Sequence, residues 1–227
     1  MTEKPDDAQA DLLIREVDED LRQEQLEKLW KRHGGAIIAV AVALVLAVAG
    51  WQGWRSWEVK QRVASSQRYA EAVKLAEQGK RDDAGQQLQS LAADGTKGYR
   101  VLAQLKRAEL RQQAGDTAGA AEIYGAVAAD SGVDKAYRDM AAVKAAYLTL
   151  DGGDAAAIEK QVEPLAAETS AWRHSAREII ALAAAKRGDT AKAADLFRKL
   201  AEDAAAPQGL RARAAEMLAA IGQRPKG

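Results

Sequence analysis

Cysteine and asparagine are both absent from this chain of 227 residues. Without cysteine there are no disulfides, no thiol chemistry, no thiolate metal sites and no lipidated cysteine to serve as an anchor. Histidine occurs only at His33 and His174, and two distant histidines without cysteine do not predict a metal site. No Gly-x-x-x-x-Gly-Lys-Ser/Thr loop for phosphate binding occurs. These absences predict a protein that is not an enzyme and that uses no cofactor, metal or small-molecule substrate.

Charge balances over the whole chain but not along it. Residues 1–33 carry ten acids and six bases, a net charge of −4, whereas the remainder carries 23 acids and 27 bases, a net charge of +4. No run of Lys and Arg with interleaved aromatic residues occurs, so we expect no nucleic-acid partner. The abundant Ala, Leu, Glu, Lys, Arg and Gln favour helices and predict an all-α chain.

One apolar run, residues 34–54, contains no charged side chain. A helix of about 20 residues spans the roughly 30 Å hydrocarbon core of a bilayer, so this run predicts a single transmembrane helix. Tryptophan prefers the headgroup layer, and four of the five tryptophans lie at the two ends of the run. These candidate membrane-interface residues are Trp30, Trp51, Trp54 and Trp57.

Two alternatives compete with an uncleaved anchor. Ala47-Val48-Ala49 has the small-x-small form of a signal-peptide cleavage site, but the preceding 33 residues are acidic and the run is longer than a usual signal core. A buried core helix rarely stays apolar on every face over this length. We therefore favour the anchor, which divides the chain into a tail (1–33), a transmembrane helix (34–54) and a soluble domain (55–227).

The tail is predicted to contain a short amphipathic helix, residues 11–31, with Leu13, Val17 and Leu21 on one face and acidic residues opposite. The acidic face is either solvated or a docking arm for a basic partner. Lys and Arg are equally frequent near both ends of the apolar run, so the positive-inside rule gives almost no orientation. Because a short tail retained in the cytoplasm is the commoner arrangement, we expect a cytoplasmic N-terminus.

The soluble domain contains an internal repeat. Residues 115–124 nearly match residues 188–197, and looser copies start at Gly79 and Gly153, so that successive glycines are 36, 38 and 35 residues apart. A small residue follows five positions after the glycine in three copies, and a large apolar residue follows nine positions after it in all of them. The candidate repeat-packing residues are Gly79, Gly115, Gly153, Gly188, Ala84, Ala120, Ala193, Leu88, Tyr124, Val162 and Phe197.

This pattern predicts stacked helical hairpins. Each glycine ends a helix in the left-handed conformation, and the Asp or Thr that follows in three copies caps the next helix. The small residue permits close packing, and the large one fills the space between hairpins that share one core. Pro164 is expected to kink or bound a helix, and Pro207 precedes a last helix, about 208–221, with Arg211 and Arg213 on its outer surface.

The period and residue types resemble tetratricopeptide repeats, which have about 34 residues per unit. The resemblance covers residues 62–222, and a generic array of helical hairpins is the alternative. Some tetratricopeptide domains hold a peptide carboxylate with asparagine and lysine, a mode that the absence of asparagine disfavours. Candidate contact residues are instead Tyr69, Tyr99, Arg100, Arg107 and Trp172, although packing between hairpins explains the aromatic ones equally well.

One N-terminal membrane helix followed by a weak tetratricopeptide array resembles the YfgM-like family of ancillary subunits of the bacterial Sec translocon. The local matches are Trp30 to Gly34 at the entry of the membrane helix and Gly50-Trp51, Trp54-Arg55 and Trp57 at its exit. The resemblance implies an inner-membrane protein with periplasmic repeats, with the SecYEG channel and a PpiD-type periplasmic chaperone as partners, and a role in passing exported proteins to folding factors. An inner-membrane scaffold for envelope organisation or cell division is the alternative.

Overall fold

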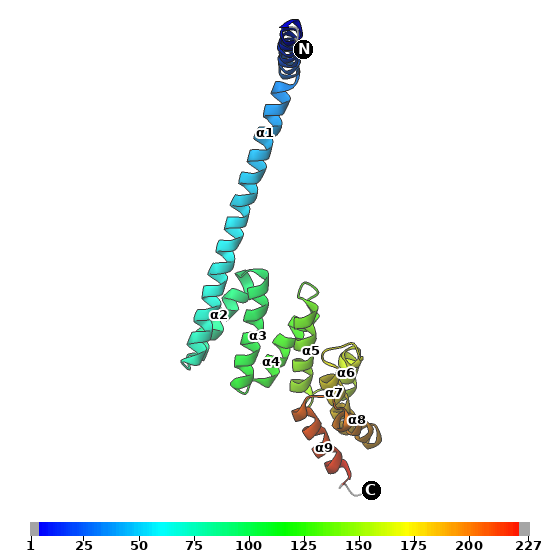
Figure 1. Cartoon of the computed structure of the whole chain (residues 1–227). Coiled ribbons are helices and arrows are strands. Elements are labelled where there is room, and N and C mark those ends of the chain that lie inside the picture. Colours follow the sequence, from blue (N-terminus) through cyan, green and yellow to red (C-terminus); the bar gives the residue numbers. More distant parts are fainter. Residues whose placement is uncertain (1–4, 223–227) are drawn as a thin grey trace. The chain divides into compact units, whose positions relative to one another are not determined.

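The computed structural model describes the backbone of residues 5–222 and the side chains of residues 24 and 27–222. Within this range the chain is helical and has no strand, which confirms the predicted all-α fold class (Figure 1). The elements are the helices α1 (Pro5–Glu77), α2 (Arg81–Asp94), α3 (Lys97–Gln113), α4 (Thr117–Ala129), α5 (Lys135–Thr149), α6 (Ala155–Val162), the 3₁₀ helix η1 (Glu163–Ala166), α7 (Arg173–Lys186), α8 (Thr190–Glu202) and α9 (Gln208–Gly222).

Helix α1 includes the residues predicted to form a short helix in the tail. Residues 11–31 are helical, but they belong to one longer helix that begins at Pro5, continues through the apolar run and ends at Glu77. Proline suits this start because the first turn of a helix leaves its N–H groups unbonded. The side chains of the apolar face proposed for residues 11–31 lie outside the described residues. Two compact units, 1–60 and 61–227, meet within α1.

The first unit leaves its apolar side chains uncovered. Every residue from 35 to 64 is exposed, including the large apolar side chains of the run 34–54. Gly34 is buried, because the ring of Trp30 lies over it: a Cβ placed on Gly34 would come within 3.3 Å of that ring. The apolar run is thus not the core helix of a soluble protein, the second alternative considered above.

The second unit is a stack of helical hairpins in chain order (Figure 1). Helix α3 packs on α2 and α4, α4 packs on α5, and α8 packs on α7 and α9. Within the described part of the chain, buried apolar side chains form clusters that each join three consecutive helices: α1–α3, α3–α5, α5–α7 and α7–α9. Each cluster uses the first helix of the next hairpin, so neighbouring hairpins share their cores, as expected for repeats.

Pro164 acts at the boundary of a helix. Helix α6 ends at Val162, and the chain continues as the 3₁₀ helix η1 with proline in its first turn. A proline inside α6 would remove a backbone hydrogen bond and clash with the preceding turn, so the helix ends before it. The last helix, α9, begins directly after Pro207 and closes the array.

Candidate protein-interaction surface

Three inter-helix turns share one backbone geometry. Gly79, Gly115 and Gly188 have φ angles of 80°, 83° and 83°, the left-handed region in which an L side chain is strained. After Gly115 and Gly188 the next helix is capped by an aspartate. Asp116 accepts a hydrogen bond from the Gly119 N–H at 2.8 Å, and Asp189 accepts one from the Lys192 N–H at 3.0 Å. The two best-matched sequence copies thus form nearly identical turns.

The third turn departs from this geometry. Gly153 does not have a positive φ, so the left-handed conformation expected for it is wrong. The Nζ of Lys186, on α7, instead donates to the backbone carbonyls of Leu150, Asp151 and Gly153 at 2.7, 2.8 and 2.9 Å. A side chain from the next hairpin therefore satisfies the carbonyls that follow α5. Asp154 still caps α6 by accepting from the Ala156 N–H at 2.9 Å.

The other candidate packing residues all lie in the interior of the array. The small residues Ala84, Ala120 and Ala193 are fully buried. The large residues nine positions after each glycine are no more than 1 % exposed; they are Leu88, Tyr124, Val162 and Phe197. Each large residue belongs to a different cluster: Leu88 to α1–α3, Tyr124 to α3–α5, Val162 to α5–α7 and Phe197 to α7–α9.

The candidate contact aromatics lie against the core. The rings of Tyr69 and Tyr99 are 6.1 Å apart and pack on the α1–α3 cluster, and burial raises the pKa of Tyr69. Trp172 packs against the α5–α7 cluster. Packing, the simpler explanation, accounts for all three residues, whereas Arg100 and Arg107 lie in hollows on the surface.

Long-range polar contacts attach the last helix to the array. His174, on α7, is 7 % exposed, and its Nε2 lies 2.9 Å from Oδ2 of Asp203, in the turn before α9. The Ala205 N–H and then His174 hold the pKa of Asp203 below its usual value. Arg213 is exposed, as expected for the outer surface of α9, and its guanidinium also reaches the buried carboxylate of Glu178. The sequence carries no signal for these contacts, because the partners are 29 and 35 positions apart.

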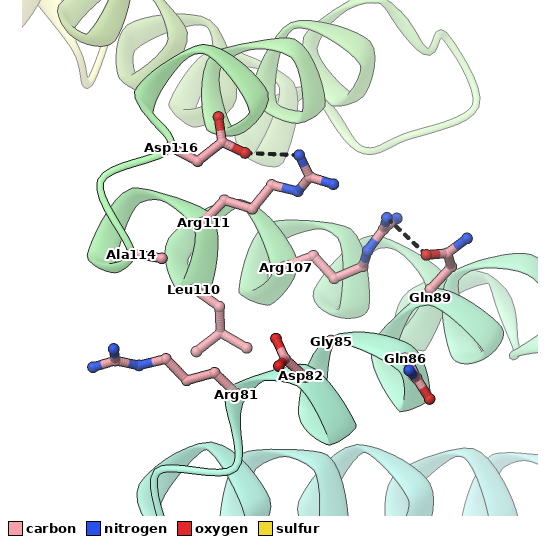
Figure 2. A pocket seen from close by; sticks show the side chains of 10 residues that line it. All are labelled: Arg81, Asp82, Gly85, Gln86, Gln89, Arg107, Leu110, Arg111, Ala114 and Asp116. Carbon is pink, nitrogen blue, oxygen red and sulfur yellow. Dashed lines mark hydrogen bonds and ion pairs between the residues drawn. The ribbon is translucent and has the colours of Figure 1, made fainter.

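A groove runs over α3, bordered by α2 and α4. On the α2 side a hollow of about 550 Å³ is lined by three arginines, two aspartates, two glutamines and apolar or small residues (Figure 2). The charged residues are Arg81, Arg107, Arg111, Asp82 and Asp116. On the α4 side a hollow of about 290 Å³ is lined by the same Arg107 and Arg111. Figure 2 shows Arg111 directed at Asp116, which accepts from its Nη1 at 2.8 Å, and Arg107 directed at Gln89.

The tryptophans predicted at the membrane interface are exposed. Trp30, Trp51, Trp54 and Trp57 expose between 54 % and 69 % of their surface. The rings of Trp54 and Trp57 lie 5.5 Å apart on adjacent turns of α1. In the described residues, the stretch Glu27–Glu77 is long and apolar enough to cross a membrane by its length and composition.

An uncovered apolar helix joined to stacked hairpins with shared cores defines a helical-repeat protein, the class whose extended surfaces bind other proteins. The chain belongs to the tetratricopeptide repeat-like domain family, whose model matches residues 27–208. Neither a curated protein nor a solved structure matches the chain. The family match covers the repeats and the apolar helix, and proteins of this kind generally mediate protein–protein interaction.

Proposed function

We propose that this chain is a membrane-anchored adaptor at the bacterial Sec export channel, where its periplasmic repeats help to pass exported proteins to a chaperone. It acts by binding rather than by catalysis. The supporting observation is that one chain combines an uncovered apolar helix with a tetratricopeptide-like array. The helix needs a bilayer to cover its side chains, and the array offers a surface for partners.

The choice of the Sec channel and a PpiD-type chaperone is supported by the resemblance to YfgM-like proteins at the two ends of the apolar run. The ring of Trp30 lies over Gly34 at one end, and Trp51, Trp54 and Trp57 are exposed at the other. Indole rings at both ends match a helix that spans the bilayer with its ends in the headgroup layers.

The proposed orientation is testable because the chain has no native cysteine. Single variants Lys28→Cys and Gln113→Cys place one thiol on each side of the apolar run, both at exposed positions. A thiol reagent that does not cross the inner membrane should label Gln113→Cys in intact cells with a permeable outer membrane and should label Lys28→Cys only after lysis. Labelling of Lys28→Cys alone in intact cells would reverse the orientation. A shortened, soluble product would instead show that a signal peptide is cleaved.

The partners are tested by photo-crosslinking in the inner membrane. A photoreactive amino acid replacing Trp54 should crosslink to the translocon, and one replacing the exposed Tyr137 of α5 should crosslink to a periplasmic folding factor. The same amino acid at Lys28 serves as the control for the other membrane face. Crosslinks only to division or cell-wall proteins would overturn the export role and favour a scaffold of the envelope.

A further inference from the structure

A line of four cationic side chains and one glutamine follows one face of α3. Lys97, Arg100, Gln104, Arg107 and Arg111 are spaced by three and four residues, the spacing that places side chains on a single helix face. We call these five residues the α3 stripe. From first to last the stripe extends about 21 Å, given the helical rise of about 1.5 Å per residue.

Most cations of the α3 stripe have no acidic partner. Arg111 pairs with Asp116, whereas Lys97, Arg100 and Arg107 form no ion pair in the described part of the chain. The pKa of Arg107 is lowered, first by burial and then by the neighbouring positive charge of Arg111. Arg107 and Arg111 thus lie close enough to repel each other, and an anion placed beside them would offset this repulsion.

Hollows accompany the α3 stripe along its length. Besides the two hollows described above, one of about 220 Å³ lies at the N-terminal end of the stripe, beside Lys97, Arg100 and Gln104. The hollows also contain apolar atoms, contributed by Val101, Leu110, Ile123 and other side chains. A line of cations between partly apolar hollows suits a segment whose acidic side chains alternate with apolar ones, whereas a flat bilayer surface would not fill the hollows.

Of the acidic residues at the edges of the groove, Asp116 pairs with Arg111, and the others form no ion pair with the α3 stripe in the described part of the chain. Asp130 accepts from the Gly132 N–H at 2.8 Å, and Asp116 accepts from the Gly119 N–H, so both stabilise turns. Glu122 and Asp82 line hollows on α4 and α2, at the two sides of α3, and form no ion pair in the described residues. These acids border the groove on both sides, which favours a narrow segment lying along α3 over a broad anionic surface.

We propose that the groove over α3 binds an acidic, partly apolar segment of a partner protein, which lies along the α3 stripe with its carboxylates on Arg100 and Arg107. This inference rests on the proposed adaptor function, because it names the chemistry of a partner. An extended segment of about six or seven residues covers the stripe at about 3.3 Å per residue. Arginine suits the role because its planar guanidinium binds a carboxylate through two hydrogen bonds.

The binding test uses the full chain in nanodiscs of neutral phosphatidylcholine. The probe is a peptide of about eight residues that alternates Glu with Leu and Ala and carries a neutral dye, and its counterpart has Lys in place of Glu. The acidic peptide should bind with an affinity that falls as salt is raised, and the basic peptide should not bind. The double variant Arg100→Glu/Arg107→Glu should weaken binding at least about tenfold. Arg198 lies exposed on α8 and forms no ion pair among the described residues, so Arg198→Glu is the matched control and should bind like the parent chain.

A second measurement does not depend on how the double variant folds. A photoreactive amino acid in place of Gln104 should crosslink to the acidic peptide, and the same amino acid in place of Arg198 should not. Equal binding by the parent and a double variant with unchanged circular dichroism would overturn the proposal. So would binding to vesicles containing phosphatidylglycerol, or to an oligonucleotide, without binding to the acidic peptide. If the chain co-purifies with the translocon but does not bind the acidic peptide, only this inference fails. If the chain binds the peptide but does not co-purify with the translocon, only the proposed function fails.

Discussion

Arg213 of α9 holds the carboxylate of Glu178 on α7 through two parallel hydrogen bonds, Nε to Oε1 and Nη2 to Oε2, each 2.9 Å long. Glu178 is only 3 % exposed, and Oε2 also accepts a hydrogen bond from the hydroxyl of Tyr147 on α5. Side chains from three helices thus satisfy one buried charge. Because Arg213 belongs to the last helix, this contact attaches that helix to the preceding hairpins.

Removing Arg213 should destabilise the C-terminal part of the array. Arg213→Ala leaves the buried carboxylate of Glu178 without its cation, and removing the partner of a buried acceptor costs about 1–3 kcal/mol. The expected result is a lower denaturation midpoint and faster amide hydrogen exchange in α9. Arg198→Ala removes an exposed arginine of α8 and should change stability by less than about 0.5 kcal/mol. Equal stability of the two variants would contradict the assigned role of the pair.

Tyr147 should make the array sensitive to alkaline pH. Burial, followed by its hydrogen bond to Glu178, raises the pKa of Tyr147 above its ordinary value of 10.0. The fold therefore favours the neutral phenol, and this contribution to stability is complete below about pH 10 and is lost as pH rises beyond it. Unfolding measured between about pH 8 and 11 should show a steeper loss for the parent chain than for Tyr147→Phe.

The matched comparison for this pH effect is Tyr137→Phe, which removes the hydroxyl of an exposed tyrosine on α5. The stability of this variant should fall with rising pH as steeply as that of the parent chain. Burial also raises the pKa values of Tyr69 and Tyr124, so some alkaline sensitivity remains in every variant. A Tyr147→Phe slope identical to that of the parent would show that Tyr147 ionises normally in the fold.

Glycine replacements should have opposite effects at turns and within helices. At Gly115, φ is 83°, so Gly115→Ala forces a left-handed alanine and should cost about 1 kcal/mol. At Gly125, within α4, a Cβ would meet nothing within 4 Å, so Gly125→Ala should stabilise the helix by up to about 1 kcal/mol. Thermal unfolding should show a lower melting temperature than the parent chain for Gly115→Ala and a higher one for Gly125→Ala. Stabilisation by Gly115→Ala would show that the turn does not need its positive φ.

Lys186 should be required for the third turn. Lys186→Met keeps the aliphatic stem but removes the amino group that binds three carbonyls, with an expected cost of about 1 kcal/mol. Amide exchange should increase at Gly153, whose N–H donates to the carbonyl of Thr149 at 2.7 Å. Lys199→Met is the control, since Lys199 is largely exposed and its ion pair is with Asp195 one turn away on the same helix. Unchanged exchange at Gly153 in Lys186→Met would contradict this role.

Features set by neighbouring residues were predictable from the sequence. The Gly-Asp-Thr copies predicted the left-handed turns at Gly115 and Gly188 and their aspartate caps, because φ preferences and capping depend on residues a few positions apart. The repeat period predicted stacked hairpins, since one amphipathic hairpin cannot bury its own apolar face. The spacing of the α3 stripe was also present in the sequence, although only Arg100 and Arg107 were singled out as contact candidates.

Tertiary structure alone decided which distant side chains meet. Gly153 resembles the other turn glycines in sequence, yet Lys186, 33 positions later, satisfies the carbonyl groups at its turn. Arg213 resembles a surface residue of a capping helix, yet it binds Glu178, 35 positions earlier. The hollows beside the α3 stripe likewise depend on where α2 and α4 pack. Local preferences therefore determined the helices, most of the turns and the apolar run, whereas the stacking of the hairpins determined the long-range polar contacts and the groove, because both require residues from different hairpins.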